Sequence, residues 1–165
     1  MNPLTAAVSL VLGFGLQAVL WPDVTLLMQP AFLLVIALLV GFNRGLAPGF
    51  WFAFTAGLLL DFYAQQRFGL FTFAMLLAYL PAFIYWQTRT NELTLPTKIT
   101  LTVTAACIYE LVLLVVIRLG NSEFAFFAEL LQVATLNVVG SVIAYAVLAP
   151  LFSALLAKSP HERSL

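Results

Sequence analysis

Charged side chains are scarce in this sequence of 165 residues: only 8% of its residues are Asp, Glu, Lys or Arg, and 63% are hydrophobic. Soluble domains usually contain about 25% charged residues, so the composition excludes a water-soluble fold. The formal net charge of zero gives no general attraction for nucleic acid. We therefore predict an integral membrane protein whose mass outside the bilayer is too small for a soluble catalytic domain.

Cysteine and histidine are nearly absent as well. Cys107 is the one cysteine and His161 the one histidine, so an internal disulfide and a His/Cys metal site are both excluded. We expect the Cys107 thiol to be packed in an apolar environment. The sequence also has no convergent Ser-His-Asp set, no glycine-rich phosphate loop and no pair of intramembrane aspartates. Neither an enzymatic activity nor a cofactor is predicted.

What the sequence does contain is a series of apolar runs, divided by charges, prolines and polar clusters. A spanning helix needs roughly 20 largely apolar residues. The predicted spans are about six in number and cover residues 4–20, 30–42, 48–62, 68–86, 97–117 and 124–156. We predict an all-α, polytopic membrane helix bundle that forms one domain, residues 1–157, followed by a short polar cytoplasmic tail, residues 158–165.

Basic residues are distributed unevenly between the loops of this six-span arrangement. One side, which includes the N-terminus, has Arg44, Arg89, Lys98, Lys158 and Arg163, whereas the other side has only Arg67 and Arg118. Basic residues in short loops prefer the cytoplasmic side of a membrane. Both termini are therefore predicted to be cytoplasmic.

Small residues recur every four positions along the third predicted span, from Gly45 through Gly49, Ala53 and Gly57 to a carboxylate, Asp61. Positions four apart share a helix face. Because little hydrophobic force brings helices together in lipid, close backbone approach along such a face is a main source of packing energy. The last four of these residues therefore form either a groove for a partner helix or a packing seam inside the bundle.

Asp61 lies at the predicted non-cytoplasmic end of this span, where a charge costs less than at the bilayer midplane. We expect its carboxylate to fix the turn into the fourth span. The partner is either Arg67 or the free amides at the start of that span, since a carboxylate near a helix N-terminus is stabilised by unpaired N–H groups. Gly69 then allows a tight turn into the helix.

Glu110 is the charged residue that lies deepest in a predicted span. It precedes Arg118 by eight residues, or about 12 Å of helix rise, which places it near the bilayer centre. A carboxyl group there is either protonated or paired inside the bundle. Asn137 and Ser141 share one face of the sixth span at a comparable depth. We predict that Glu110, Asn137 and Ser141 form an intramembrane polar clamp, and an ion, proton or ligand site is the alternative.

The stretch "QPAFLLVIALLVGFNRGLAPGFWFAFTAGLLLDFYAQQRFGLFTFAMLLAYLPAFIY" resembles the central region of the MreD family of rod shape-determining membrane proteins. A proline opens the second helix of the family pattern, and an aspartate closes the third. The matching residues are Pro30, Gly49, Gly57, Asp61, Gly69 and Tyr79.

The resemblance implies a non-enzymatic scaffold of the bacterial inner membrane that serves rod-shape determination and lateral cell-wall elongation. It further implies intramembrane helix packing against MreC, a bitopic protein, and through it a link to MreB, RodA and a class B penicillin-binding transpeptidase. The family is also similar in architecture to the S components of energy-coupling-factor transporters. A subunit that binds a small, vitamin-like molecule is therefore the alternative function.

Overall fold

The computed structural model describes residues 31–64, 69–88, 94–120 and 127–156, together with Val11, Gly13 and Gly15. Its helices are α2 (Phe32–Arg44), α3 (Leu46–Ala64), α4 (Leu70–Thr88), α5 (Leu95–Gly120) and α6 (Phe127–Leu156). This part of the chain contains no strand, so the prediction of an all-α fold is confirmed for it. Most of the first predicted span, residues 4–20, and the tail, residues 158–165, lie outside the described residues.

Four of the described helices, α3 to α6, are long and apolar enough to cross a membrane. The fifth, α2, is apolar but has only 13 residues. Each of these helices overlaps one predicted span, and the observed ends differ from the predicted ends by at most three residues. The first predicted span has no described helix of its own, although Val11, Gly13 and Gly15 are helical.

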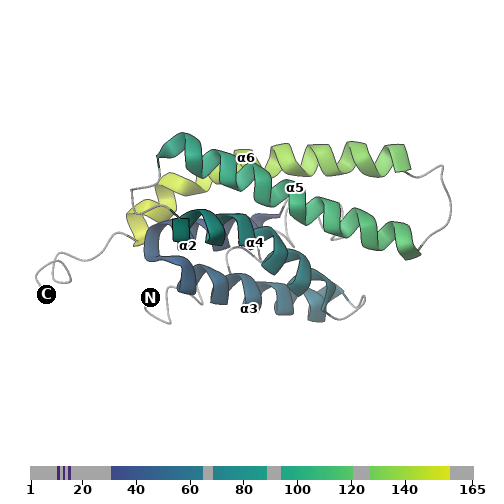
Figure 1. Ribbon diagram of the computed structural model, residues 1–165, viewed down its shortest axis with the longest axis horizontal. Helices are drawn as coiled ribbons and strands as arrows, with labels where there is room; N and C mark the ends of the chain where they lie inside the picture. Colours follow the sequence, from purple (N-terminus) through teal and green to yellow (C-terminus); the bar gives the residue numbers. More distant parts are fainter. Residues whose placement is uncertain are drawn as a thin grey trace, which may run out of the picture.

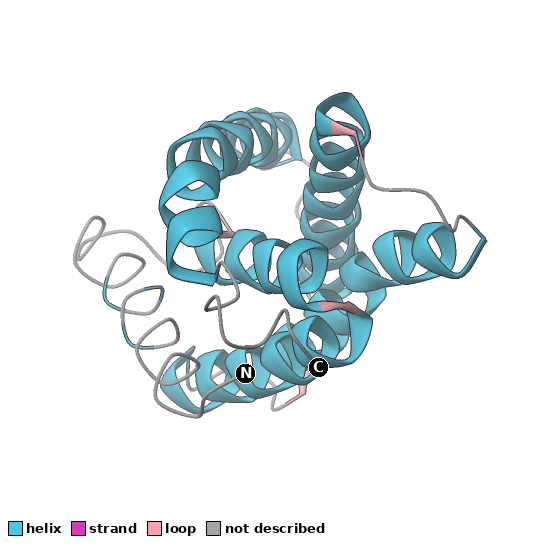
Figure 2. Cartoon of the chain, turned by 90° about the vertical axis from the view of Figure 1, so that its left-hand side faces the viewer, coloured by secondary structure: helices cyan, strands magenta, loops and turns pink. Residues whose placement is uncertain are grey.

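The helices pack in chain order, each against the next, and α6 returns to pack against α2. Figure 1 shows α2, α3 and α4 below the two longest helices, α5 and α6, and Figure 2 views the same helices from one end of the bundle. Because α2 also contacts α4 and α5, it touches each of the other described helices.

The sequence of α2 explains this central position. Every residue from Leu33 to Val40 is apolar, and each is at most 2% exposed. A helix that is apolar on all sides must be surrounded by other apolar groups. Gly13 adds to this cover, because it lies directly against the Leu33 and Ile36 side chains.

Helix ends follow the proline and glycine pattern. Pro48 and Pro96 lie in the first turns of α3 and α5, where a missing N–H leaves no helical hydrogen bond unmade. Gly45 separates α2 from α3 with a φ of +103°, a backbone conformation that other residues rarely adopt. Gly45 therefore belongs to the connection between two helices, and the small-residue stripe on α3 begins at Gly49.

Cys107 corrects one expectation from the sequence. Its side chain is exposed on α5, whereas its neighbours Ala105, Ala106 and Tyr109 are buried. The thiol lies on the outer face because three of the surrounding positions already fill the inner face of the helix. The expectation of a packed thiol is therefore wrong, and in a membrane-spanning bundle this outer face meets lipid.

Candidate functional site

The Asp61 carboxylate joins the end of α3 to the start of α4. It is only 3% exposed. Its Oδ1 accepts the Phe71 N–H at 2.8 Å, and its Oδ2 accepts both the Thr72 N–H at 3.1 Å and the Thr72 hydroxyl at 2.5 Å. The two amides belong to the first turn of α4, where N–H groups have no partner within the helix. Asp61 thus caps α4 from a neighbouring helix.

The residue that precedes α4 explains why the cap comes from elsewhere. Helices usually take this cap from a Ser, Thr, Asp or Asn side chain at the N-cap position. Here that position is Gly69, which has no side chain and a φ of +94°. Gly69 provides the turn and Asp61 provides the acceptor atoms. Arg67, the other expected partner of Asp61, lies outside the described residues.

The small-residue stripe of α3 faces the interior of the bundle. Gly49, Ala53, Gly57 and Asp61 are all buried. A Cβ atom added at Gly57 would lie 2.5 Å from the Thr72 Cα, and one added at Gly49 would lie 2.7 Å from the Gly41 Cα. The stripe is therefore a seam between α3 and both α2 and α4. Of the two alternatives, a groove for a partner helix and a packing seam inside the bundle, the structure shows the packing seam.

Tyr79 occupies the other end of this seam. Its hydroxyl packs directly against Gly41 of α2 and Gly49 of α3. A Cβ atom on either glycine would clash with it. The hydroxyl donates to the Leu46 carbonyl at 3.3 Å. The α3–α4 pair is thus fixed by a polar contact at each end, Asp61 with Thr72 and Tyr79 with Leu46, while Ala74, Ala78 and Ala82 of α4 are buried between and beyond them.

Glu110, Asn137 and Ser141 are buried together between α5 and α6. Each is at most 5% exposed, and Asn137 lies close enough to the Glu110 carboxyl to interact with it. Glu110 Oε1 and Asn137 Nδ2 nevertheless have no hydrogen-bond partner among the described residues. The Ser141 hydroxyl donates to the Asn137 carbonyl at 2.8 Å and accepts the Ala31 N–H at 3.1 Å. The same face of α6 therefore also holds the start of α2.

Glu110, Asn137 and Ser141, together with Tyr109 and Asp61, form what we call the polar core. Tyr109 is the member that the sequence analysis did not identify. Its side chain is 1% exposed and its hydroxyl has no hydrogen-bond partner among the described residues. Both Glu110 and Asp61 are near enough to interact with it electrostatically. Only its position next to Glu110 could have pointed to it, since Tyr is common in apolar cores.

This arrangement can hold helices at fixed positions. The two described carboxylates are separate: Asp61 is saturated by α4 donors, and Glu110 faces Asn137. Within the described ranges, no three His, Cys, Asp or Glu side chains gather as metal ligands would. The fold and its polar core thus define a multi-pass membrane helix bundle.

The comparison with known proteins gives the family. The chain matches the family of rod shape-determining protein MreD over residues 2–159, nearly its whole length. It belongs to the MreD family, as the residue pattern from Pro30 to Tyr79 indicated. Membership associates the chain with rod-shape determination in the bacterial inner membrane, and it gives no support to a vitamin-binding subunit. No curated protein and no solved structure matches the chain.

Proposed function

We propose that this chain is a non-enzymatic scaffold subunit for rod-shape determination and lateral cell-wall elongation. The match to the MreD family over residues 2–159 carries this proposal. The structure supports it in one respect, because Asp61, Tyr79 and Ser141 form hydrogen bonds that join one helix to another. A scaffold needs helices that keep fixed positions relative to one another.

The proposal includes a partner, a bitopic MreC-like protein whose single helix packs against the bundle within the membrane. The glycine seam of α3 is occupied by α2 and α4, so the partner helix has to approach another face. Apolar side chains are exposed on the outer faces of several helices, for example Phe73 on α4, Leu111 on α5 and Ile143 on α6. Through this partner the chain is linked to MreB, RodA and a class B penicillin-binding transpeptidase.

We also propose a six-span topology with both termini in the cytoplasm. The four long helices and α2 account for five segments of the chain, and residues 4–20 supply the sixth by their apolar composition. The unequal distribution of basic residues between the loops supports this orientation. The likeness to S components of energy-coupling-factor transporters is part of the same proposal and concerns architecture alone.

The test uses rod-shaped bacteria depleted of their own MreD-type protein. Cells that express this chain together with its cognate MreC-like partner should regain rod shape, and the two proteins should copurify. Photocrosslinkers at Phe73, Leu111 and Ile143, which are exposed on three different helices, then identify the partner-facing helix. Round cells despite normal membrane levels of both proteins would disprove the proposal.

A further inference from the structure

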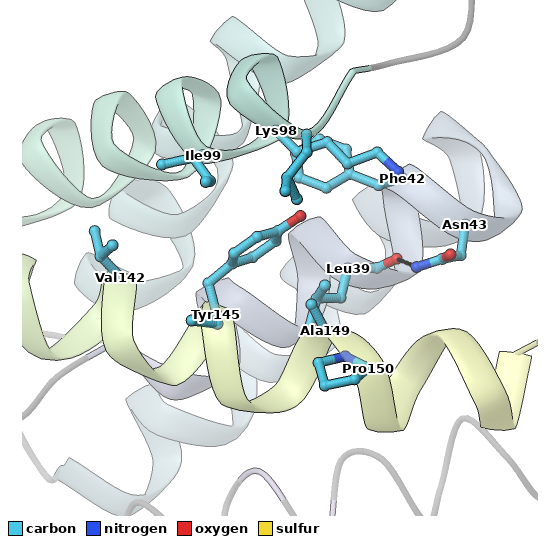
Figure 3. Close-up of a pocket in the computed structure, with 11 residues that line it drawn as sticks. Leu39, Phe42, Asn43, Lys98, Ile99, Val142, Tyr145, Ala149 and Pro150 are labelled. Atoms are coloured by element: carbon cyan, nitrogen blue, oxygen red, sulfur yellow. Dashed lines mark hydrogen bonds between the residues drawn. The ribbon is translucent and has the colours of Figure 1, made fainter.

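A cavity of about 440 Å³ lies between the C-terminal end of α2, the first turns of α5 and the second half of α6 (Figure 3). Its walls are mostly apolar and include Leu39, Ile99, Val142 and Ala149. This volume is within the range of about 300–1,000 Å³ that is usual for small-molecule sites. The cavity is separate from the polar core of Asp61 and Glu110, and the scaffold function does not account for it.

Three polar side chains line this otherwise apolar cavity: Lys98, Tyr145 and Asn43. In Figure 3, Lys98 and the Tyr145 hydroxyl lie at the same side of the cavity as Phe42. An edge-to-face contact with Phe42, with 6.4 Å between ring centroids, holds the Tyr145 ring in place. The Asn43 amide nitrogen donates to the Leu39 carbonyl at 2.7 Å. Lys98 is therefore the one cation in a wall whose other polar groups are neutral.

No described carboxylate neutralises Lys98. Asp61 and Glu110 are the two acidic residues whose side chains the structure describes, and Asp61 is bonded to α4. Glu110 is twelve residues farther along the same helix, about 18 Å away along the helix axis. An anion that enters the cavity would thus meet a positive charge that no described carboxylate neutralises.

The position of the cavity in the bundle indicates what kind of anion this is. Arg44 is the last residue of α2 and Leu95 the first residue of α5, so the cavity lies where two helices end and the membrane surface begins. Lys side chains commonly lie along apolar surface while their ammonium group reaches the headgroup level. The occupant that matches both features has an anionic headgroup joined to a long apolar chain.

We propose that this cavity binds an anionic phospholipid of the leaflet on the Lys98 side. One acyl chain lies against Leu39, Ile99, Val142 and Ala149, and the phosphate lies at Lys98 within reach of the Tyr145 hydroxyl. The site is independent of the proposed scaffold function, since it rests on the cavity and its charge alone.

The experiment measures lipid binding to the purified, delipidated full chain by native mass spectrometry. Phosphatidylglycerol and phosphatidylcholine with identical acyl chains are added in equal amounts. We expect one bound lipid and a preference for phosphatidylglycerol of about fivefold, the effect of one Lys near an anionic headgroup. Lys98→Gln should abolish this preference and Lys98→Arg should retain it, while helical content and melting temperature stay unchanged.

A second variant tests the apolar part of the site. Ala149→Phe fills the cavity and should lower the binding of both lipids, whereas Ile84→Phe, on the exposed outer face of α4, should change neither. Arg44→Gln is the matched charge control, because Arg44 lies at the same end of the bundle and does not line the cavity. Equal binding of the two lipids by the unmodified chain, or an unchanged preference in Lys98→Gln, would overturn the proposal.

Discussion

Gly57 of α3 and Thr72 of α4 are in backbone contact: a Cβ atom on Gly57 would lie 2.5 Å from the Thr72 Cα and 3.0 Å from its nitrogen. The same Thr72 gives its N–H and its hydroxyl to Asp61. Gly57 and Asp61 therefore act on one residue of the neighbouring helix. The glycine allows α4 to come close, and the carboxylate holds it there.

Substitution of Gly57 should separate α3 from α4. Because Thr72 cannot move away without losing its bonds to Asp61, we expect Gly57→Ala to lower the free energy of unfolding by about 1–3 kcal/mol, as overpacking does. Gly57→Leu should strongly reduce the amount of folded protein, measured by size-exclusion chromatography and thermal melting in detergent. Thr55→Leu, exposed on the same helix, is the control. Normal folding of Gly57→Leu with loss of the partner would show instead that the seam receives a partner helix.

The stability that the Asp61 cap contributes should depend on how many acceptor atoms the side chain at position 61 offers. Asp61→Asn keeps one carbonyl oxygen for the α4 amides and should cost about 1 kcal/mol, whereas Asp61→Leu removes all three bonds and should cost about 2–3 kcal/mol. Thr72→Val leaves both backbone bonds in place and should resemble the Asn variant. Thermal unfolding in detergent measures these differences. Equal stability of the Asn and Leu variants would argue against a capping role.

Two buried tyrosines provide a matched comparison. The Tyr79 hydroxyl donates to Leu46, so Tyr79→Phe should lose about 0.6 kcal/mol, the average for a hydrogen bond within a membrane protein. The Tyr109 hydroxyl has no hydrogen-bond partner in the described part of the chain, so Tyr109→Phe should leave stability unchanged or raise it. Melting temperatures of both variants decide the point. A larger loss for Tyr109→Phe would reveal a bound water or ligand at that hydroxyl.

Glu110 and Asn137 should behave as a pair. Glu110→Gln should preserve the fold and rod shape, while Glu110→Leu should lower the free energy of unfolding by about 1 kcal/mol, because Asn137 then loses its polar neighbour. The double variant Glu110→Leu/Asn137→Leu should recover that loss, since no unpaired polar side chain remains. A Gln variant that folds normally yet fails to support rod shape would favour an ion or proton role for Glu110.

Labelling of the chain termini tests the topology. We expect Pro160→Cys, in a background where Cys107 is replaced by Ser, to be protected from a membrane-impermeant thiol reagent in intact cells and labelled after lysis. The background change is needed because the Cys107 thiol is exposed on α5. Labelling of position 160 from outside the cell would refute a cytoplasmic C-terminus.

Much of the fold could be predicted from the sequence because lipid imposes simple rules. Runs of apolar residues with the length of a membrane give helices, and their charges and prolines mark the ends. Gly49, Ala53 and Gly57 could be placed on one face because helical spacing alone decides that. Asp61 accepts hydrogen bonds from the Phe71 and Thr72 amides. These are unpaired N–H groups at a helix start, the kind of partner that the sequence analysis expected.

The sequence could not decide which neighbours these faces meet. A stripe of small residues has the same spacing whether it packs against α4 or against another protein, so the internal position of Gly57 required the three-dimensional structure. The space for the Tyr79 hydroxyl depends on Gly41 as well as Gly49. Gly41 lies on a different helix, so no periodicity in the sequence relates the two glycines. The exposed Cys107 and the cavity at Lys98 likewise depend on how α2, α5 and α6 are oriented, which no local pattern encodes.

The short length of α2 has a consequence for the surrounding bilayer. Thirteen residues rise only about 20 Å, less than the roughly 30 Å of a hydrocarbon core. A helix this short that touched lipid would thin the membrane around it or force its neighbours to tilt. Because α2 is buried except at the cavity beside its C-terminal end, we expect the bulk acyl chains to meet mainly the longer helices α3 to α6 among those described, which would transmit little mismatch to the bilayer. The difference between the length of α2 and the membrane thickness is thus accommodated inside the protein, at the end of α2 where the cavity lies.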